Sequence, residues 1–247
     1  MKFKFENQNI IITGATRGIG KQIALDLHEL NGNLILTGTN KKQIEKLNQQ
    51  NSSPRVKYKY LDFLDIDSTN KFLDYVSGLN KIDILINNAA INRLNSIQNS
   101  SLIDWNDMIS VNLTGAYRLI RTISPIMISN KYGRILNISS IFSTISKEER
   151  IIYTATKSGL NGITVGISND LSKYDILCNS ISPGFVKTDL TYKNLSENEI
   201  IALENQIPIG RLAEPADISK TSIYLISNLN KYLTGQNIIV DGGYTNI

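Results

Sequence analysis

The sequence predicts an α/β protein with a doubly wound, mainly seven-stranded parallel sheet that carries helices on both faces. Short β-branched runs alternate with amphipathic helical stretches, which is the pattern of repeated βαβ units. The strand candidates read as nearly continuous apolar runs, as expected when helices cover both faces of a parallel sheet. A length of 247 residues with 41% hydrophobic content suits one large domain, residues 1–247.

The elements follow in a regular order. The strand candidates are Asn9–Thr13, Leu34–Thr37, Val56–Tyr60, Ile82–Asn87, Arg134–Ile138, Leu177–Ile181 and Asn237–Val240. The helical candidates are Gly20–Leu30, Lys41–Gln50, Thr69–Leu79, Leu102–Ser129, Tyr153–Ser172 and Pro215–Ser227, the last with a first-turn proline. The polar stretch Phe185–Arg211 breaks this order and holds one possible short helix, Ser196–Asn205. Segments of this length are commonly substrate lids or disordered loops, and we expect a lid.

The composition argues against several classes of partner. No stretch approaches the roughly 20 uninterrupted apolar residues that a membrane helix needs, and the N-terminal residues show no apolar signal-peptide region. We therefore expect a cytoplasmic protein with no membrane partner. The net charge of +4 comes from dispersed lysines rather than from a block of like charges, so we expect no nucleic-acid partner.

The cysteine and histidine content limits the chemistry. The single cysteine, Cys178, lies in an apolar run and is expected to be a small buried residue rather than a nucleophile. The single histidine, His28, lies in a predicted helix with no cysteine cluster elsewhere, so no metal site is expected.

A glycine-rich turn joins the first predicted strand to the first helix. The segment reads Thr13-Gly14-Ala15-Thr16-Arg17-Gly18-Ile19-Gly20. Glycines here let backbone N–H groups approach a pyrophosphate, and the helix N-terminus favours the anion. Loops also carry glycine for purely conformational reasons, but the position at the first strand-to-helix junction favours dinucleotide binding. The expected contacts are Gly14, Thr16, Arg17, Gly18, Ile19 and Gly20.

The end of the second strand indicates which dinucleotide is bound. Sites that prefer NAD place an Asp or Glu there to accept hydrogen bonds from the ribose 2′-hydroxyl. This chain has Thr37-Gly38-Thr39-Asn40-Lys41-Lys42 instead, and Arg17, Thr39 and Lys41 would attract a 2′-phosphate. The alternative is that the two lysines are solvated residues of a first helical turn. We expect NADP(H) to be favoured over NAD(H).

Tyr153 and Lys157 form the catalytic candidate. They are four residues apart in a predicted helix and therefore lie on one face of it. An adjacent ammonium stabilises a phenolate and is expected to bring the phenol pKa down toward working pH. Such a pair alone is a weak signal, but Ser140 follows a predicted strand, and open α/β sheets bind ligands at the carboxyl ends of their strands.

Taken together, these motifs resemble the short-chain dehydrogenase/reductase family in its single-domain branch, over essentially the whole chain. The matching residues are the Thr13–Gly20 turn, Asp62, Asn87-Asn88-Ala89, Asn112, Ser140, Tyr153, Lys157, Pro183-Gly184, Thr188 and Asp241-Gly242-Gly243. The resemblance implies a Rossmann-type fold and oligomerisation as a dimer or tetramer. It also implies hydride transfer between the cofactor and a carbonyl or alcohol substrate.

The resemblance also implies roles for individual residues. Tyr153 would be the general acid in reduction and the base in oxidation, Lys157 would bind the nicotinamide ribose, Ser140 would polarise the carbonyl, and Asn112 would support a proton relay. The further cofactor contacts that it implies are Asp62, Phe63, Asn87, Ala89, Pro183, Gly184, Val186 and Thr188.

Two departures bear on the substrate. Ala90 stands where the family usually has glycine, a change that adds one methyl group near the cofactor. The charged segment Ser146–Arg150 stands just before Tyr153, where many acyl-carrier-protein reductases are neutral and glycine-rich. This segment either contributes to an altered substrate site or is simply a solvated turn.

Three functions therefore stay open. The nearest resemblance is to 3-oxoacyl-(acyl-carrier-protein) reductases, and the positive charge would suit an acidic carrier protein. The charged segment and the polar Thr191-Tyr192-Lys193-Asn194 also fit a small polar substrate such as a sugar derivative. An inactive dinucleotide-binding regulatory or scaffold protein is the third, although Ser140, Tyr153 and Lys157 are all present. Gly159, Gly162 and Gly166 would allow either a close helix partner or packing on the protein's own sheet.

Overall fold

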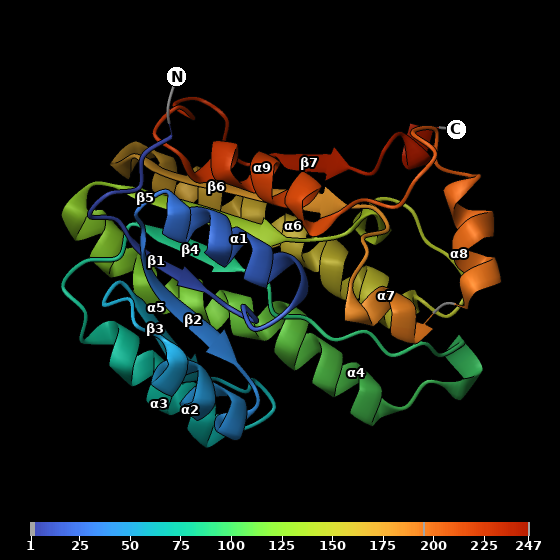
Figure 1. The fold of residues 1–247 in the computed structure, drawn as a ribbon, viewed down its shortest axis with the longest axis horizontal. Coiled ribbons are helices and arrows are strands. Elements are labelled where there is room, and N and C mark those ends of the chain that lie inside the picture. Colours follow the sequence, from blue (N-terminus) through green and yellow to red (C-terminus); the bar gives the residue numbers. More distant parts are fainter. Residues whose placement is uncertain (1–2, 195, 247) are drawn as a thin grey trace.

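One parallel sheet organises the chain (Figure 1). The computed structural model describes residues 3–194 and 196–246. The strands are β1 (Asn9–Ile12), β2 (Asn33–Gly38), β3 (Val56–Tyr60), β4 (Ile84–Asn87), β5 (Gly133–Ile138), β6 (Ile176–Pro183) and β7 (Asn237–Val240). Their order in the sheet is β3-β2-β1-β4-β5-β6-β7, and every neighbouring pair is parallel. The predicted doubly wound seven-stranded sheet is confirmed. Its strand order changes direction between β1 and β4, the place where such sheets bind ligands.

Helices lie on both faces of the sheet. They are α1 (Gly18–Glu29), α2 (Lys41–Gln50), α3 (Ile66–Ser77), α4 (Leu102–Ile109), α5 (Gly115–Asn130), α6 (Ile151–Leu171), α7 (Asp189–Asn194), α8 (Glu197–Glu204) and α9 (Pro215–Ile226). The helix expected from Thr69 begins earlier, at Ile66, because the Asp65 carboxylate accepts hydrogen bonds from the N–H groups of Asp67 and Ser68.

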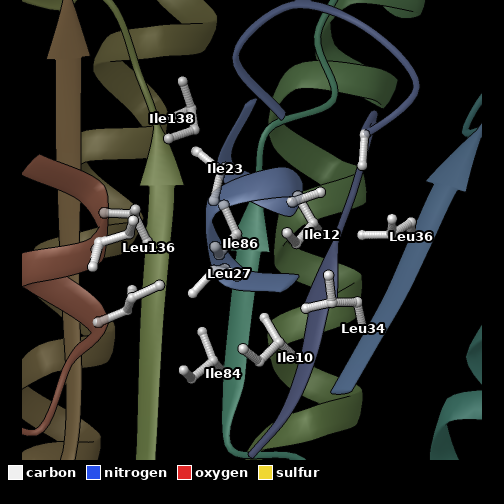
Figure 2. Packing of buried hydrophobic residues seen from close by; sticks show 14 of the residues in the cluster. Ile10, Ile12, Ile23, Leu27, Leu34, Leu36, Ile84, Ile86, Leu136 and Ile138 are labelled. Carbon is white, nitrogen blue, oxygen red and sulfur yellow. The ribbon is translucent and has the colours of Figure 1, made fainter. Parts of the chain in front are cut away.

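Side chains of the central strands alternate between two hydrophobic clusters. Ile10 and Ile12 of β1 belong to the cluster under α1 and α9, whereas Ile11 belongs to the cluster under α3, α5 and α6. Figure 2 shows Ile23 and Leu27 of α1 packed against the isoleucines and leucines of the sheet. Each of these fully buried side chains stabilises the fold by about 1.5–3 kcal/mol. Burial on both faces holds the strands, and therefore their carboxyl ends, in fixed positions.

The helix predicted over Leu102–Ser129 is confirmed in extent, but it is not uniform. The structure has α4, then a π turn at Ser110–Thr114, then α5, with helical backbone at both junctions. Asn112 lies inside this wide turn, and its side chain bonds the backbone of Ile91.

The lid region holds two helices rather than the single short one expected. Figure 1 shows α7 and α8 beyond the carboxyl ends of the strands. Buried Leu203, Ile207 and Leu212 form a small separate cluster beneath them. Leu195, within the predicted lid, lies outside the described residues. Over the part of the chain that the structure describes, no helix has the length and apolar character needed to cross a membrane.

Candidate active site

The predicted site residues follow the carboxyl ends of neighbouring strands. Thr13 and Gly14 follow β1, Asn87 ends β4 and Asn88 follows it, and Ser140 follows β5. Because all these strands are parallel, their carboxyl ends meet at one edge of the sheet. The topology therefore brings the cofactor and catalytic candidates to one place.

The glycine turn is locked to the loop after β4. Gly14 and Gly18 have φ of 64° and 55°, a region that favours glycine. A Cβ on Gly20 would lie 2.6 Å from the Gly14 carbonyl oxygen, so this turn admits no side chain there. Asn88 donates its amide to the carbonyls of Thr13 and Gly14 at 3.0 and 2.9 Å. Asn88 therefore shapes the turn that would hold a pyrophosphate.

The segment after β6 lies against the glycine turn. Gly184 lies against the backbone of Asp241, where a Cβ would come within 2.8 Å. Val186 forms an isolated parallel bridge with Ala213. Further along, the Thr188 methyl group lies 3.4 Å from the position of a Cβ on Gly18. The Pro183–Thr188 segment is thus brought to the glycine turn, as a contact with the same ligand would require.

The 2′-phosphate candidates lie at the surface. Arg17, Thr39 and Lys41 are exposed, and the Lys41 ammonium lies 4.6 Å above the centre of the Tyr60 ring. Gly38 is packed against Thr16, whose methyl carbon would lie 2.6 Å from a Cβ there. The end of β2 therefore presents cations and hydroxyls and has no carboxylate of its own.

Asp62 and Phe63 follow β3. The Asp62 carboxylate accepts a hydrogen bond from the Leu64 N–H at 3.0 Å. The Phe63 ring packs against Gly115, where a Cβ would lie 2.7 Å from it. Phe63 also lines a small hollow with Thr13, Asn87, Ala89, Val111, Asn112, Ala116, Ile138 and Leu160. The residues around this hollow come from the carboxyl ends of the strands and the loops after them, and from the helices that pack behind them, α5 and α6.

Asn87 supplies an unsatisfied acceptor in this hollow. Its amide nitrogen donates to Asn137 Oδ1 at 2.8 Å, whereas its Oδ1 is buried with no hydrogen-bond partner among the described residues. An unpaired buried acceptor costs free energy unless a ligand or water completes it. A ribose hydroxyl group is a suitable donor, so the residues present fit a dinucleotide.

Ser140 and Tyr153 lie next to each other at this edge of the sheet. Ser140 is buried and its Oγ accepts from the Phe142 N–H at 3.2 Å, which fixes the hydroxyl at the start of a short 3₁₀ turn. Burial raises the pKa of the Tyr153 phenol to about 12, while the neighbouring Ser140 hydroxyl and the Arg150 charge lower it. The serine and the tyrosine are thus close enough to address one substrate oxygen.

Lys157 lies one helical turn beyond Tyr153, as predicted. Its side chain is 2% exposed, its Nζ donates to the Ile138 carbonyl at 2.7 Å, and this Nζ lies 5.5 Å from the centre of the Tyr153 ring. Burial lowers the pKa of the Lys157 ammonium to about 7. In the protein alone, burial therefore places the phenol pKa above its usual value and not below it, and the expected lowering by Lys157 stays a prediction for the cofactor-bound protein.

Asn112 connects three parts of the site. Its Oδ1 accepts from the Ile91 N–H at 2.8 Å, and its Nδ2 donates to the Ile91 carbonyl at 2.9 Å and to Thr156 Oγ1 at 3.2 Å. Because Thr156 precedes Lys157, Asn112 links the loop after β4 to α6. In this arrangement the Asn112 side chain holds the Ile91 backbone and Thr156 in place.

The charged segment before Tyr153 divides into two parts. Residues 146–149 are exposed, as in a solvated turn. Arg150 instead turns inward, with its guanidinium carbon 5.6 Å from the centre of the Phe142 ring. Phe142 in turn contacts Tyr153 and Phe185 edge to face. Within the charged segment, only Arg150 therefore contacts the Phe142 ring beside Tyr153.

The remaining candidates separate into buried and outward-facing groups. Cys178 is buried, as predicted, and burial raises the pKa of its thiol to about 12. Gly159 packs on Leu113 of the same chain, whereas nothing lies within 4 Å of a Cβ on Gly162 or Gly166. Among the residues described, no group of three or more His, Cys, Asp or Glu side chains is placed to hold a metal ion.

Four residues outside the predicted contacts also shape the site. Thr13 Oγ1 accepts from the N–H groups of Asn88 and Ala89, and Thr156 receives the Asn112 amide. Arg150 and Phe142 pack beside Tyr153. The sequence indicates Thr13 and Arg150 only as members of the glycine turn and of the charged segment. Phe142 and Thr156 carry no sequence signal and are visible only as tertiary contacts.

Comparison with known proteins finds relatives that match nearly the whole chain. A family model described as enoyl-(acyl carrier protein) reductase matches residues 14–245. The 3-oxoacyl-(acyl-carrier-protein) reductase FabG of Aquifex aeolicus is 34% identical over 252 residues, covering 98% of this chain and 99% of that protein. The FabG of Buchnera aphidicola subsp. Baizongia pistaciae is 36% identical, covering 94% and 95%.

Solved structures share the fold. A putative NAD(P)-dependent gluconate 5-dehydrogenase from Beutenbergia cavernae with bound NADP superposes with a TM-score of 0.92 at 25% identity, covering 99% of each chain. The protein ElxO with NADP bound gives a TM-score of 0.88 at 27% identity, covering 97% of this chain and 99% of that one. These neighbours carry NADP on a backbone that follows the present chain almost throughout.

Proposed function

The chain belongs to the short-chain dehydrogenase/reductase family of oxidoreductases, and from this membership we propose that it reduces the 3-oxo group of an acyl thioester with NADPH. The observation that carries this proposal is the grouping of the Ser140 hydroxyl, the Tyr153 phenol and the Lys157 ammonium at the carboxyl edge of the sheet. The names of the FabG relatives favour a 3-oxoacyl chain on an acyl carrier protein as the substrate.

The proposed cofactor contacts follow the edge from β1 to β6. NADP(H), when bound, supplies or accepts the hydride. The glycine turn, Asn87, Ala89 and the Pro183–Thr188 segment would hold the pyrophosphate, ribose and nicotinamide portions, with Asp62 and Phe63 beside the adenine. The unpaired Oδ1 of Asn87 supports this assignment most directly.

Four residues would carry the proton chemistry. Ser140 orients the carbonyl, and Tyr153 donates a proton to its oxygen in reduction and accepts one in oxidation. Lys157 binds the ribose and supports the phenolate, and Asn112 holds the neighbouring backbone in place for a proton relay. Positioned proton transfer of this kind contributes about 10²–10⁴ in rate.

NADP(H) is proposed over NAD(H). Arg17, Thr39 and Lys41 are exposed around the end of β2, which has no carboxylate to repel a 2′-phosphate. Structural neighbours that carry NADP favour the same choice.

A second candidate substrate is a small polar ketone such as a sugar derivative. Structural neighbours named as gluconate dehydrogenases and the inward-facing Arg150 favour it. The two are separated by following NADPH oxidation with acetoacetyl thioester and with a keto sugar acid, using Tyr153→Phe as the blank. Turnover of the thioester supports the first proposal. Activity on the sugar acid alone would replace it, and no turnover of either would favour the binding-protein alternative.

The proposed assembly is a homodimer or tetramer of one-domain subunits, each with a lid at about residues 185–211. The outer faces of α4, α5 and α6 carry exposed apolar side chains, among them Ile103, Tyr117 and Val165, next to the open positions at Gly162 and Gly166. A second copy of the chain would cover them. The expected location in the cytoplasm stays a prediction.

A further inference from the structure

Arg150 carries a charge that the proposed proton transfer does not use. Its guanidinium carbon lies 5.6 Å from the centre of the Phe142 ring. The Phe142 ring in turn meets the Tyr153 ring edge to face, with 6.4 Å between centroids and 74° between planes. Phe142 therefore packs against both the cation and the catalytic candidate.

This cation is not held in an ion pair in the part of the chain that the structure describes, and its Nε is buried without a hydrogen-bond partner. Burial lowers the pKa of Arg150, and the charge of the neighbouring Glu149 raises it in part. Glu149 is exposed to solvent, where water and salt screen its charge. A partly buried cation without a partner costs stability. A role for the charge of Arg150, in addition to packing, would explain why an arginine stands at this position.

The backbone fixes where Arg150 stands. It is the last residue before α6, and its carbonyl accepts the hydrogen bond of the Thr154 N–H at 2.7 Å. The carbonyl of Glu149 accepts from the Asn95 N–H at 3.3 Å, which ties this loop to the one after β4. Arg150 is the N-cap and Tyr153 the third residue of α6, and the charge of Arg150 acts on the Tyr153 phenol.

We propose that Arg150 is a positioning residue for the proton transfer, whose permanent charge beside Phe142 favours the phenolate of Tyr153 over the phenol. This inference rests on the proposed role of Tyr153. The other groups facing the tyrosine are the Ser140 hydroxyl, the Phe142 ring and the Lys157 ammonium. Burial lowers the pKa of Lys157 to about 7, so its charge is partly lost at neutral pH, whereas a guanidinium stays charged.

The charge acts where negative charge develops. In reduction, the substrate carbonyl would take up a hydride supplied by bound NADPH as its π bond opens, while the Tyr153 O–H bond breaks and an O–H bond forms on the substrate oxygen. The cofactor would then be oxidised to NADP⁺, and the phenol oxygen would be left negative. A nearby positive charge lowers the energy of that state. In alcohol oxidation, the same charge keeps more of Tyr153 in the basic form.

The test measures the acidity of Tyr153 directly in the NADP⁺-loaded protein. Tyrosine is replaced throughout by 3-fluorotyrosine, which has a more acidic phenol, and the resonance absent from Tyr153→Phe identifies residue 153 in the ¹⁹F spectrum. Its titration midpoint is compared in Arg150→Met, Arg150→Lys and Lys147→Met. The last removes an equal charge from an exposed position in the same loop. Arg150→Gln serves as a second neutral variant should Arg150→Met fail to fold.

Arg150→Met or Arg150→Gln should raise the midpoint by about one pH unit, while Arg150→Lys and Lys147→Met stay near the wild type. The alcohol-oxidation rate should need a correspondingly higher pH in the neutral variants. An unchanged midpoint in the neutral variants would overturn the inference. Failure of the proposed function is separate: it appears as absent turnover of 3-oxoacyl thioester by the wild type, and the ¹⁹F titration does not depend on turnover.

Discussion

The Lys157 ammonium lies 5.5 Å from the centre of the Tyr153 ring, yet its hydrogen bond goes to the carbonyl of Ile138, the last residue of β5. Helix α6 is thereby tied to the edge of the sheet by the same group that is proposed to bind the ribose. Cofactor binding would compete for this ammonium with the end of β5.

Tyr153→Phe should separate cofactor binding from turnover. The substitution removes one hydroxyl and keeps the ring that packs against Phe142. We expect NADPH affinity, measured by fluorescence titration, to stay within about twofold, while kcat falls by about 10²–10⁴ because positioned proton transfer is lost. Tyr192→Phe, in the proposed lid, is the matched control. Unchanged turnover in Tyr153→Phe would remove the tyrosine from its proposed role.

The stability of the ligand-free protein should depend on pH through Lys157. Its pKa is about 7 in the fold and about 10.5 in the unfolded chain, so between these values the unfolded state holds one more proton. The free energy of unfolding should therefore rise with pH above 7, by up to about 1.4 kcal/mol per unit. Urea unfolding of wild type and Lys157→Met from pH 6.5 to 9 checks this. The variant should lack the rise, and parallel curves would contradict it.

Thr39→Asp should shift the cofactor preference. A carboxylate at the end of β2 would repel a 2′-phosphate and accept hydrogen bonds from a 2′-hydroxyl instead. We expect the ratio of kcat/KM for NADPH over NADH to fall by about 10- to 100-fold. Gln49→Asp, exposed at the far end of α2, adds the same charge and should leave the ratio unchanged. An equal effect of both substitutions would indicate a general charge effect and not a 2′-phosphate site.

Gly162→Arg should weaken the proposed assembly without harming the subunit. Nothing lies within 4 Å of a Cβ at this helical position, and arginine favours helix over glycine by about 0.5–1 kcal/mol. We expect sedimentation velocity to show smaller species and circular dichroism to show an intact fold. Gln49→Arg on exposed α2 is the control. A distribution identical to the wild type would place the interface elsewhere on the surface.

The strands and the sheet edge were predictable because each depends on a local pattern. Apolar runs mark β1, β4 and β5, and the parallel sheet brings their carboxyl ends together, so Ser140 and Asn87 follow directly. The π turn around Asn112 was not predictable. It arises from hydrogen bonds to the peptide of Ile91, 21 residues away in sequence, and the surrounding residue types are compatible with helix.

The electrostatics of the site also depend on the tertiary structure. The spacing of Tyr153 and Lys157 sets which helix face they share, but not how deeply that face is buried. Nor does it show that Ile138 supplies an acceptor for the ammonium. The inward turn of Arg150 likewise follows from the start of α6 and from Phe142, neither of which a charge pattern describes.

The wide turn at Ser110–Thr114 sets the angular phase between α4 and α5. Each residue of an α-helix advances the chain by about 100°, so one additional residue rotates α4 by roughly that angle relative to a continuous rod. Deleting one residue there would restore regular α-helical winding and move Leu102 and Ile103 to a different side of the helix, while withdrawing Asn112 from the peptide of Ile91. A deletion of one residue from this turn would thus alter both the outer surface of α4 and the loop beside α6.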